Sequence, residues 1–124
     1  MLAFELDSQT DQWTSQVVAS RTNPTFGRDM SMSGDGTTVI TGTPGHNAAD
    51  GTYDIGLTEV FRVQNGGEWA QVGQNLTDNE QFGRYGLWVS ISQNGNTIAT
   101  GTTFAGDDDN GKVDVYQFES ADEC

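Results

Sequence analysis

The side chains of this chain that could bind a metal are concentrated in one short acidic run. Asp107, Asp108 and Asp109 stand side by side, and Asn110 and Gly111 follow them. Carboxylate oxygens are the ligands that calcium and magnesium prefer, so the three aspartates are the candidate metal ligands. The competing interpretation is a solvated turn, pushed outward by its own charge, and an acidic run of this kind is more often such a turn.

The single histidine is the other residue type that could do chemistry. His46 lies in a loop with Asp50 and Asp54, and together they could bind a metal or form an acid–base pair. A lone histidine in a glycine-containing loop is usually just exposed. The chain has no second histidine, no serine elbow and no phosphate loop, and Cys124 has no base beside it. We therefore expect no cofactor and no catalysis, with a hydrolase or lyase as the less favoured alternative.

The elements that position these loops are repeated. Phe26-Gly27-Arg28 opens a stretch that Phe82-Gly83-Arg84 opens again, 56 residues further on. The first stretch continues through the return segment Thr38–Thr43, and the second through Thr97–Thr102. A repeat of this length indicates a solenoid, a propeller or an array.

Each repeat unit has the pattern of antiparallel strands. Apolar and polar residues alternate before Asp35-Gly36 and before Asn94-Gly95, and such dipeptides between alternating segments predict tight hairpins. No stretch shows helical periodicity. Strands are predicted over residues 30–33, 37–43, 57–63, 68–73, 89–92, 96–102 and 112–118, with two more at 3–6 and around Trp13 to Val18.

These strands define an all-β fold organised in three units. Residues 1–25 hold the last two strands of a unit, 26–81 hold a complete unit of four, and 82–124 hold a unit that lacks its last strand. Four-stranded antiparallel units repeated in this way are typical of β-propeller blades, here about two of them. A β-sandwich of nine strands is the alternative.

The motifs at the unit boundaries resemble those of a known family. Phe26-Gly27, Gly42-Thr43-Pro44 and Val60–Val63 are similar to the FG-GAP repeats of the integrin α-subunit propeller and its relatives, and Phe82-Gly83 and Val115–Phe118 repeat the likeness. The resemblance implies propeller blades within a closed ring, and an extracellular or cell-surface location. Many relatives carry a calcium loop in the first hairpin. Here each hairpin offers a single Asp35 or Asn94, too few oxygen ligands, so calcium is not expected there.

The aromatic residues are the candidate recognition surface. Tyr53, Tyr85, Trp88 and Phe104 could stack against a sugar or a protein partner. Trp88 stands where the first unit has Asp29, so it is less suited to a shared core. Trp13 and Trp69 recur at one place in the repeat, which favours packing.

Charge restricts the partners. The net charge of −13 disfavours nucleic acid and anionic membrane surfaces. The sequence contains no signal peptide and no transmembrane segment.

Two blades cannot close a ring and open sheet edges invite pairing, so we expect either a fragment of a longer propeller or a homo-oligomer in which several copies form one ring. The expected function is a non-catalytic binding or scaffold module for protein or glycan, and a purely structural subunit is the alternative.

Overall fold

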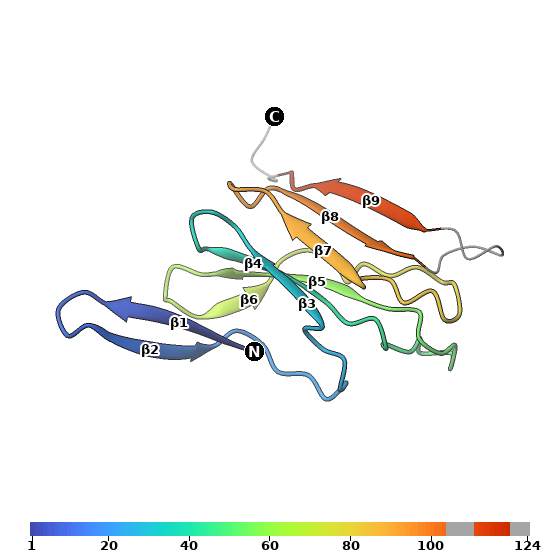
Figure 1. Ribbon diagram of the computed structural model, residues 1–124, viewed down its shortest axis with the longest axis horizontal. Coiled ribbons are helices and arrows are strands. Elements are labelled where there is room, and N and C mark those ends of the chain that lie inside the picture. The colour runs from blue at the N-terminus through green and yellow to red at the C-terminus, as the bar shows by residue number, and fades with distance from the viewer. Residues whose placement is uncertain (104–110, 120–124) are drawn as a thin grey trace.

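The computed structural model describes residues 1–103 and 111–119, and these residues form an all-β structure without helices (Figure 1). Alternating side chains and glycine-containing turns favour strands over helices here. No helix within the described ranges could cross a membrane. The nine strands are β1 (Leu2–Asp7), β2 (Gln12–Val17), β3 (Asp29–Met32), β4 (Thr38–Gly42), β5 (Thr58–Val63), β6 (Trp69–Gln71), β7 (Trp88–Ile91), β8 (Thr97–Thr102) and β9 (Lys112–Gln117).

The strands form three antiparallel sheets, and none of the three is closed in the part of the chain that is described. The first sheet is the hairpin β1–β2, the second has the order β3-β4-β5-β6, and the third has the order β7-β8-β9. Each sheet lies within one of the three predicted units. Figure 1 shows the hairpin at one end of the molecule, the second sheet in the middle and the third at the other end.

Strand registers repeat between the sheets. In the first sheet Leu6 is paired with Trp13, and in the second sheet Val63 is paired with Trp69. The hairpins β3–β4 and β7–β8 likewise pair equivalent residues along their length. Residues of corresponding strands can therefore be matched between the sheets, although the three sheets differ in their number of strands.

Both tight hairpins are closed by the same side-chain network. Asp35 Oδ1 accepts hydrogen bonds from Ser33 Oγ, from the Thr37 backbone N–H and from Thr37 Oγ1, at 2.7 to 3.0 Å. In the third sheet Asn94 Oδ1 accepts from Ser92 Oγ and from the backbone N–H that follows the turn. These bonds hold the pKa of the Asp35 carboxyl below its ordinary value, with the Thr37 hydroxyl as the largest cause.

The core between the first and second sheets is small. Phe61 packs with Val18 and Ala19, and the half-buried Ala3 and Trp69 border this cluster. Beside it, Arg21 Nη2 lies 2.9 Å from Oε2 of the buried Glu59. The first sheet therefore touches the second through the Ala3 side of β1.

The second and third sheets approach more closely. Thr58 Oγ1 and Thr100 Oγ1 share a buried hydrogen bond of 2.6 Å between the two sheets. Asp29 Oδ2 accepts a hydrogen bond of 2.8 Å from the backbone N–H of Val89. A Cβ added to Gly42 would overlap the carbonyl oxygen of Gly86, so this contact between the sheets requires glycine.

Candidate functional site

Tyr85 was predicted to belong to an exposed recognition surface, and that prediction is wrong. The residue is only 1% exposed, and its hydroxyl donates a 2.7 Å hydrogen bond to Asp114 Oδ2. The segment before β7 returns to the segment before β5, where Tyr85 N–H donates to Ile55 O and Leu57 N–H donates to Tyr85 O. Burial, followed by the bond to Asp114, raises the pKa of Tyr85.

The structure exposes the other two described aromatic candidates but does not bring them into one site. Trp88 is 61% exposed and lines a cleft of about 610 Å3 together with Arg28, Asp54 and Arg84. Tyr53 is also exposed but does not line this cleft. Phe104 lies outside the described residues.

The candidate metal and acid–base residues give no assembled centre. Asp107, Asp108 and Asp109 lie outside the described residues. Residues 1–103 and 111–119 contain no group of three or more His, Cys, Asp or Glu side chains that could hold a metal. Near His46, Asp50 Oδ1 accepts hydrogen bonds from Thr52, and Asp54 Oδ2 lies 4.0 Å from Arg84 Nε, so both carboxylates have other partners.

The first sheet exposes one face that is almost entirely apolar. Because side chains alternate along a strand and paired residues share a face, β1 and β2 place their large apolar side chains on the same side of the hairpin. All of them are exposed. We call this surface the N-terminal face; it consists of Leu2, Phe4, Leu6, Trp13 and Val17.

The third sheet exposes a second apolar face at the opposite end of the molecule. Trp88 and Val113 are both aligned with Gly101 in the strand register, and Val115 follows two residues later on the same side. All three are strongly exposed, and a shallow hollow runs beside Trp88 and Val113. We call Trp88, Val113 and Val115 the C-terminal face.

The repeat shows what covers each of these faces elsewhere in the chain. Phe61 is the equivalent of Phe4 in the second sheet, and it is 2% exposed because Val18 and Ala19, which follow β2, pack with it, whereas Phe4 is 60% exposed. The N-terminal face is therefore the side on which a preceding sheet would pack.

The residues of the second sheet that are equivalent to the C-terminal face contact the sheet that follows. Thr58, the equivalent of Val113, bonds to Thr100 of the following sheet. Asp29, the equivalent of Trp88, bonds to Val89 of that sheet. Trp88 thus occupies a position that, one unit earlier, is a contact between sheets.

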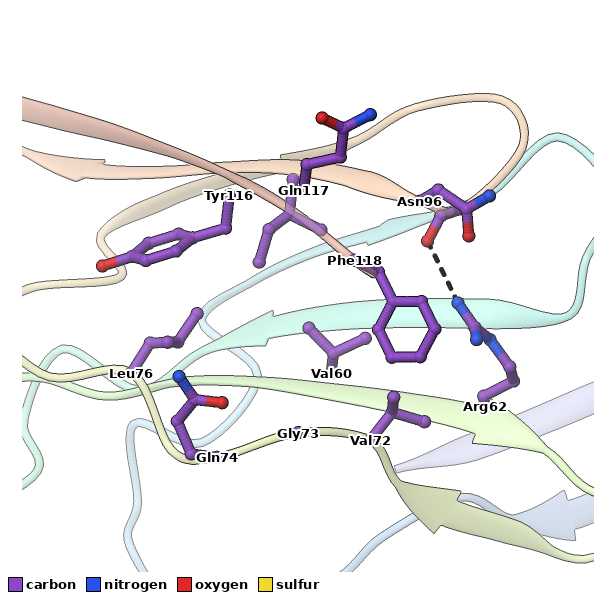
Figure 2. Close-up of a pocket in the computed structure, with 12 residues that line it drawn as sticks. Val60, Arg62, Val72, Gly73, Gln74, Leu76, Asn96, Tyr116, Gln117 and Phe118 are labelled. Atoms are coloured by element: carbon purple, nitrogen blue, oxygen red, sulfur yellow. Dashed lines mark hydrogen bonds between the residues drawn. The ribbon is translucent and has the colours of Figure 1, made fainter. Parts of the chain in front are cut away.

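A separate groove lies between the second and third sheets, beside β9. Figure 2 shows the ring of Phe118, the residue after β9, lying between Val60 and Arg62 of β5, while the Tyr116 ring extends from β9 over the part of the groove where Leu76 lies. The Arg62 guanidinium lies 4.9 Å from the Phe118 ring centroid and donates a hydrogen bond of 3.2 Å to Gly95 O. The cavity between these side chains is about 140 Å3.

Comparison with protein-family models and with curated protein sequences finds no match to this chain. The functional argument therefore rests on the repeat and on the surfaces that it leaves open. The equivalence of Phe4 and Phe61 follows from the sequence alone, where Ala3–Leu6 aligns with Val60–Val63. The difference in exposure between these two residues could not be predicted from the sequence.

Proposed function

We propose that the protein is a non-catalytic scaffold module of the β-propeller type, which assembles head to tail with copies of itself and offers binding surfaces to a protein or glycan partner. One observation carries the proposal. The two exposed apolar faces are the repeat equivalents of the two sides of a sheet contact already present inside the chain. The N-terminal face of one copy would meet the C-terminal face of the next.

The exposure of the apolar side chains on the two faces supports a contact between copies. The chain carries a net charge of −13. A cluster of large apolar side chains on its surface has an unfavourable free energy in water unless another surface covers it. Three described sheets in series also favour blades over the sandwich alternative, in which two sheets pack face to face. A contact between two different faces closes into a ring or continues as a filament, depending on the rotation between copies. Each copy would contribute its three sheets in series, so two copies would supply six sheets and three copies nine.

Sedimentation of the purified chain tests this function. At micromolar concentration we expect a species of at least twice the chain mass of 13.4 kDa. Phe4→Asp, which puts a charge on the N-terminal face, should lower the mass to that of the monomer. Thr14→Asp adds the same charge to the opposite side of the hairpin and should leave the assembly intact. Equal masses for the two variants would overturn the proposal.

As an alternative to head-to-tail assembly, which would cover Trp88, the cleft beside Trp88 favours recognition of a glycan. Its volume of about 610 Å3 lies within the range of small-molecule sites. An exposed tryptophan beside Arg28 and Arg84 combines a stacking surface with hydrogen-bond donors. A glycan array separates this function from assembly: Trp88→Ala should abolish binding of any captured glycan, whereas Phe4→Asp should not. Capture of no glycan, or binding that persists in Trp88→Ala, would exclude the second function.

A further inference from the structure

We propose that the free edge of β9 and the groove beside it form an acceptor site for an extended segment of another protein, one that presents a tryptophan followed three residues later by a valine. The segment would add to the third sheet as a fourth strand. The contact already made by β6 in the second sheet is the basis for this inference.

The edge of β9 has unpaired backbone groups. Among the described strands β9 pairs only with β8. Phe118 N–H donates to Asn96 O, and hydrogen-bonded pairs alternate along an antiparallel ladder. The backbone groups of Val113, Val115 and Gln117 therefore point away from β8, toward the open side.

The equivalent edge in the second sheet is occupied. There Val72 N–H donates to Val60 O at 2.8 Å, and Thr58 and Leu76 exchange two backbone hydrogen bonds. Val60 is the equivalent of Val115. The same register would place a partner's valine opposite Val115, as Val72 lies opposite Val60.

The groove supplies the place for the tryptophan. In the second sheet Trp69 pairs with Val63, and it borders the Phe61 cluster that the first sheet covers. Phe118 is the equivalent of Val63, so a tryptophan at the equivalent of Trp69 would project toward the groove between Phe118 and β5. An apolar cavity of roughly 150 Å3 holds a benzene molecule, and the groove of about 140 Å3 has room for the six-membered ring of an indole.

The side chains around the groove suit an aromatic ring. The Arg62 guanidinium already stacks over Phe118, and a second ring beside it would gain a cation–π contact and apolar contact with Val60 and Tyr116. Main-chain hydrogen bonds to the edge would supply affinity, and the ring would supply selectivity, as in other cases of strand addition.

The chain itself provides the probe. A blocked synthetic peptide with the sequence of residues 67–76, Gly-Glu-Trp-Ala-Gln-Val-Gly-Gln-Asn-Leu, carries the required pattern. Titrated into the isotope-labelled full chain and followed by NMR, it should bind saturably. Amide exchange at Val113, Val115 and Gln117 should slow by tenfold or more. The exchange of Asp114 and Tyr116, whose N–H groups face β8, should change far less.

Two matched controls test whether binding requires the tryptophan of the peptide and the outward N–H groups of β9. A peptide with alanine in place of its tryptophan should bind at least tenfold more weakly. In the protein, Gln117→Pro removes one outward N–H, which an edge strand tolerates, and should abolish binding, whereas Gln117→Ala should retain it.

Three outcomes would overturn the proposal: no saturable binding, binding without slowed exchange along β9, or protection of β9 that rises with protein concentration in the absence of peptide. The last outcome would assign the edge to a second copy of the chain. The readout is amide exchange at the edge, so it is independent of the mass measurement that tests assembly.

Discussion

Phe61 and Phe4 occupy equivalent positions in neighbouring sheets, and truncating each to alanine should have opposite consequences. Phe61 is 2% exposed and packs with Val18 and Ala19. Phe61→Ala removes a buried ring and leaves a cavity, which costs about 3–5 kcal/mol in protein cores. Native domains have total stabilities of about 5–15 kcal/mol, so this variant should be severely destabilised at every protein concentration.

Phe4→Ala should instead act through assembly. The ring is 60% exposed in the single chain, and burying a whole phenylalanine side chain contributes about 1.5–3 kcal/mol. Covering the exposed part at a contact between copies therefore contributes about 1–2 kcal/mol per contact, a factor of roughly 5 to 30 in the association constant. In dilute solution, where the chain is monomeric, the variant should lose well under 1 kcal/mol.

Urea unfolding followed by tryptophan fluorescence, repeated over a hundredfold range of protein concentration, measures both effects. The unmodified chain should gain apparent stability with concentration, because association favours the folded state, and Phe4→Ala should gain less. Phe61→Ala should lie well below both throughout. The reasoning fails if Phe4→Ala is as unstable as Phe61→Ala in dilute solution, or if Phe4→Ala matches the unmodified chain at every concentration.

Three further substitutions probe the contacts within the chain. Gly42→Ala should destabilise the protein by several kcal/mol in a urea melt, because the added methyl group overlaps the Gly86 carbonyl; a change below 0.5 kcal/mol would contradict that packing. Arg21→Ala leaves the buried Glu59 without its cation and should cost about 1–3 kcal/mol, less than the 3–5 kcal/mol of a fully buried pair because Arg21 is partly solvated. Asp35 has a lowered pKa in the folded state, so its contribution is present near neutral pH and is lost as the pH falls through that pKa, below about 4. In melts between pH 7 and pH 2.5, Asp35→Asn should lose less stability on acidification than the unmodified chain, and an equal loss would contradict this role of the carboxylate.

The arrangement of strands could be predicted because its causes are local. Alternation and glycine-containing turns place a strand over residues 37–43, and the structure has β4 at Thr38–Gly42. The predicted strand over 112–118 is observed as β9, Lys112–Gln117. Only the ends differ, where the last residues leave the ladder.

The burial of individual side chains could not be predicted in the same way, because it depends on which sheets are neighbours. Tyr85 was expected at the surface, yet its backbone bonds to Ile55 and Leu57 in the segment before β5. Phe4 and Phe61 have equivalent places in the sequence repeat, yet only Phe61 packs in a buried cluster, with Val18 and Ala19. A repeat in the sequence identifies equivalent positions, but the position of each unit in the series decides which equivalents are covered.

Mixing two blocked variants tests the head-to-tail contact most directly. Phe4→Asp blocks the N-terminal face and Val115→Asp blocks the C-terminal face, so each variant alone keeps one functional face and should sediment as a monomer. Mixed in equal amounts, they should form a one-to-one dimer and nothing larger, because only one competent pair of faces remains. A mixture that stays monomeric, or a single variant that forms dimers by itself, would contradict the proposed assembly.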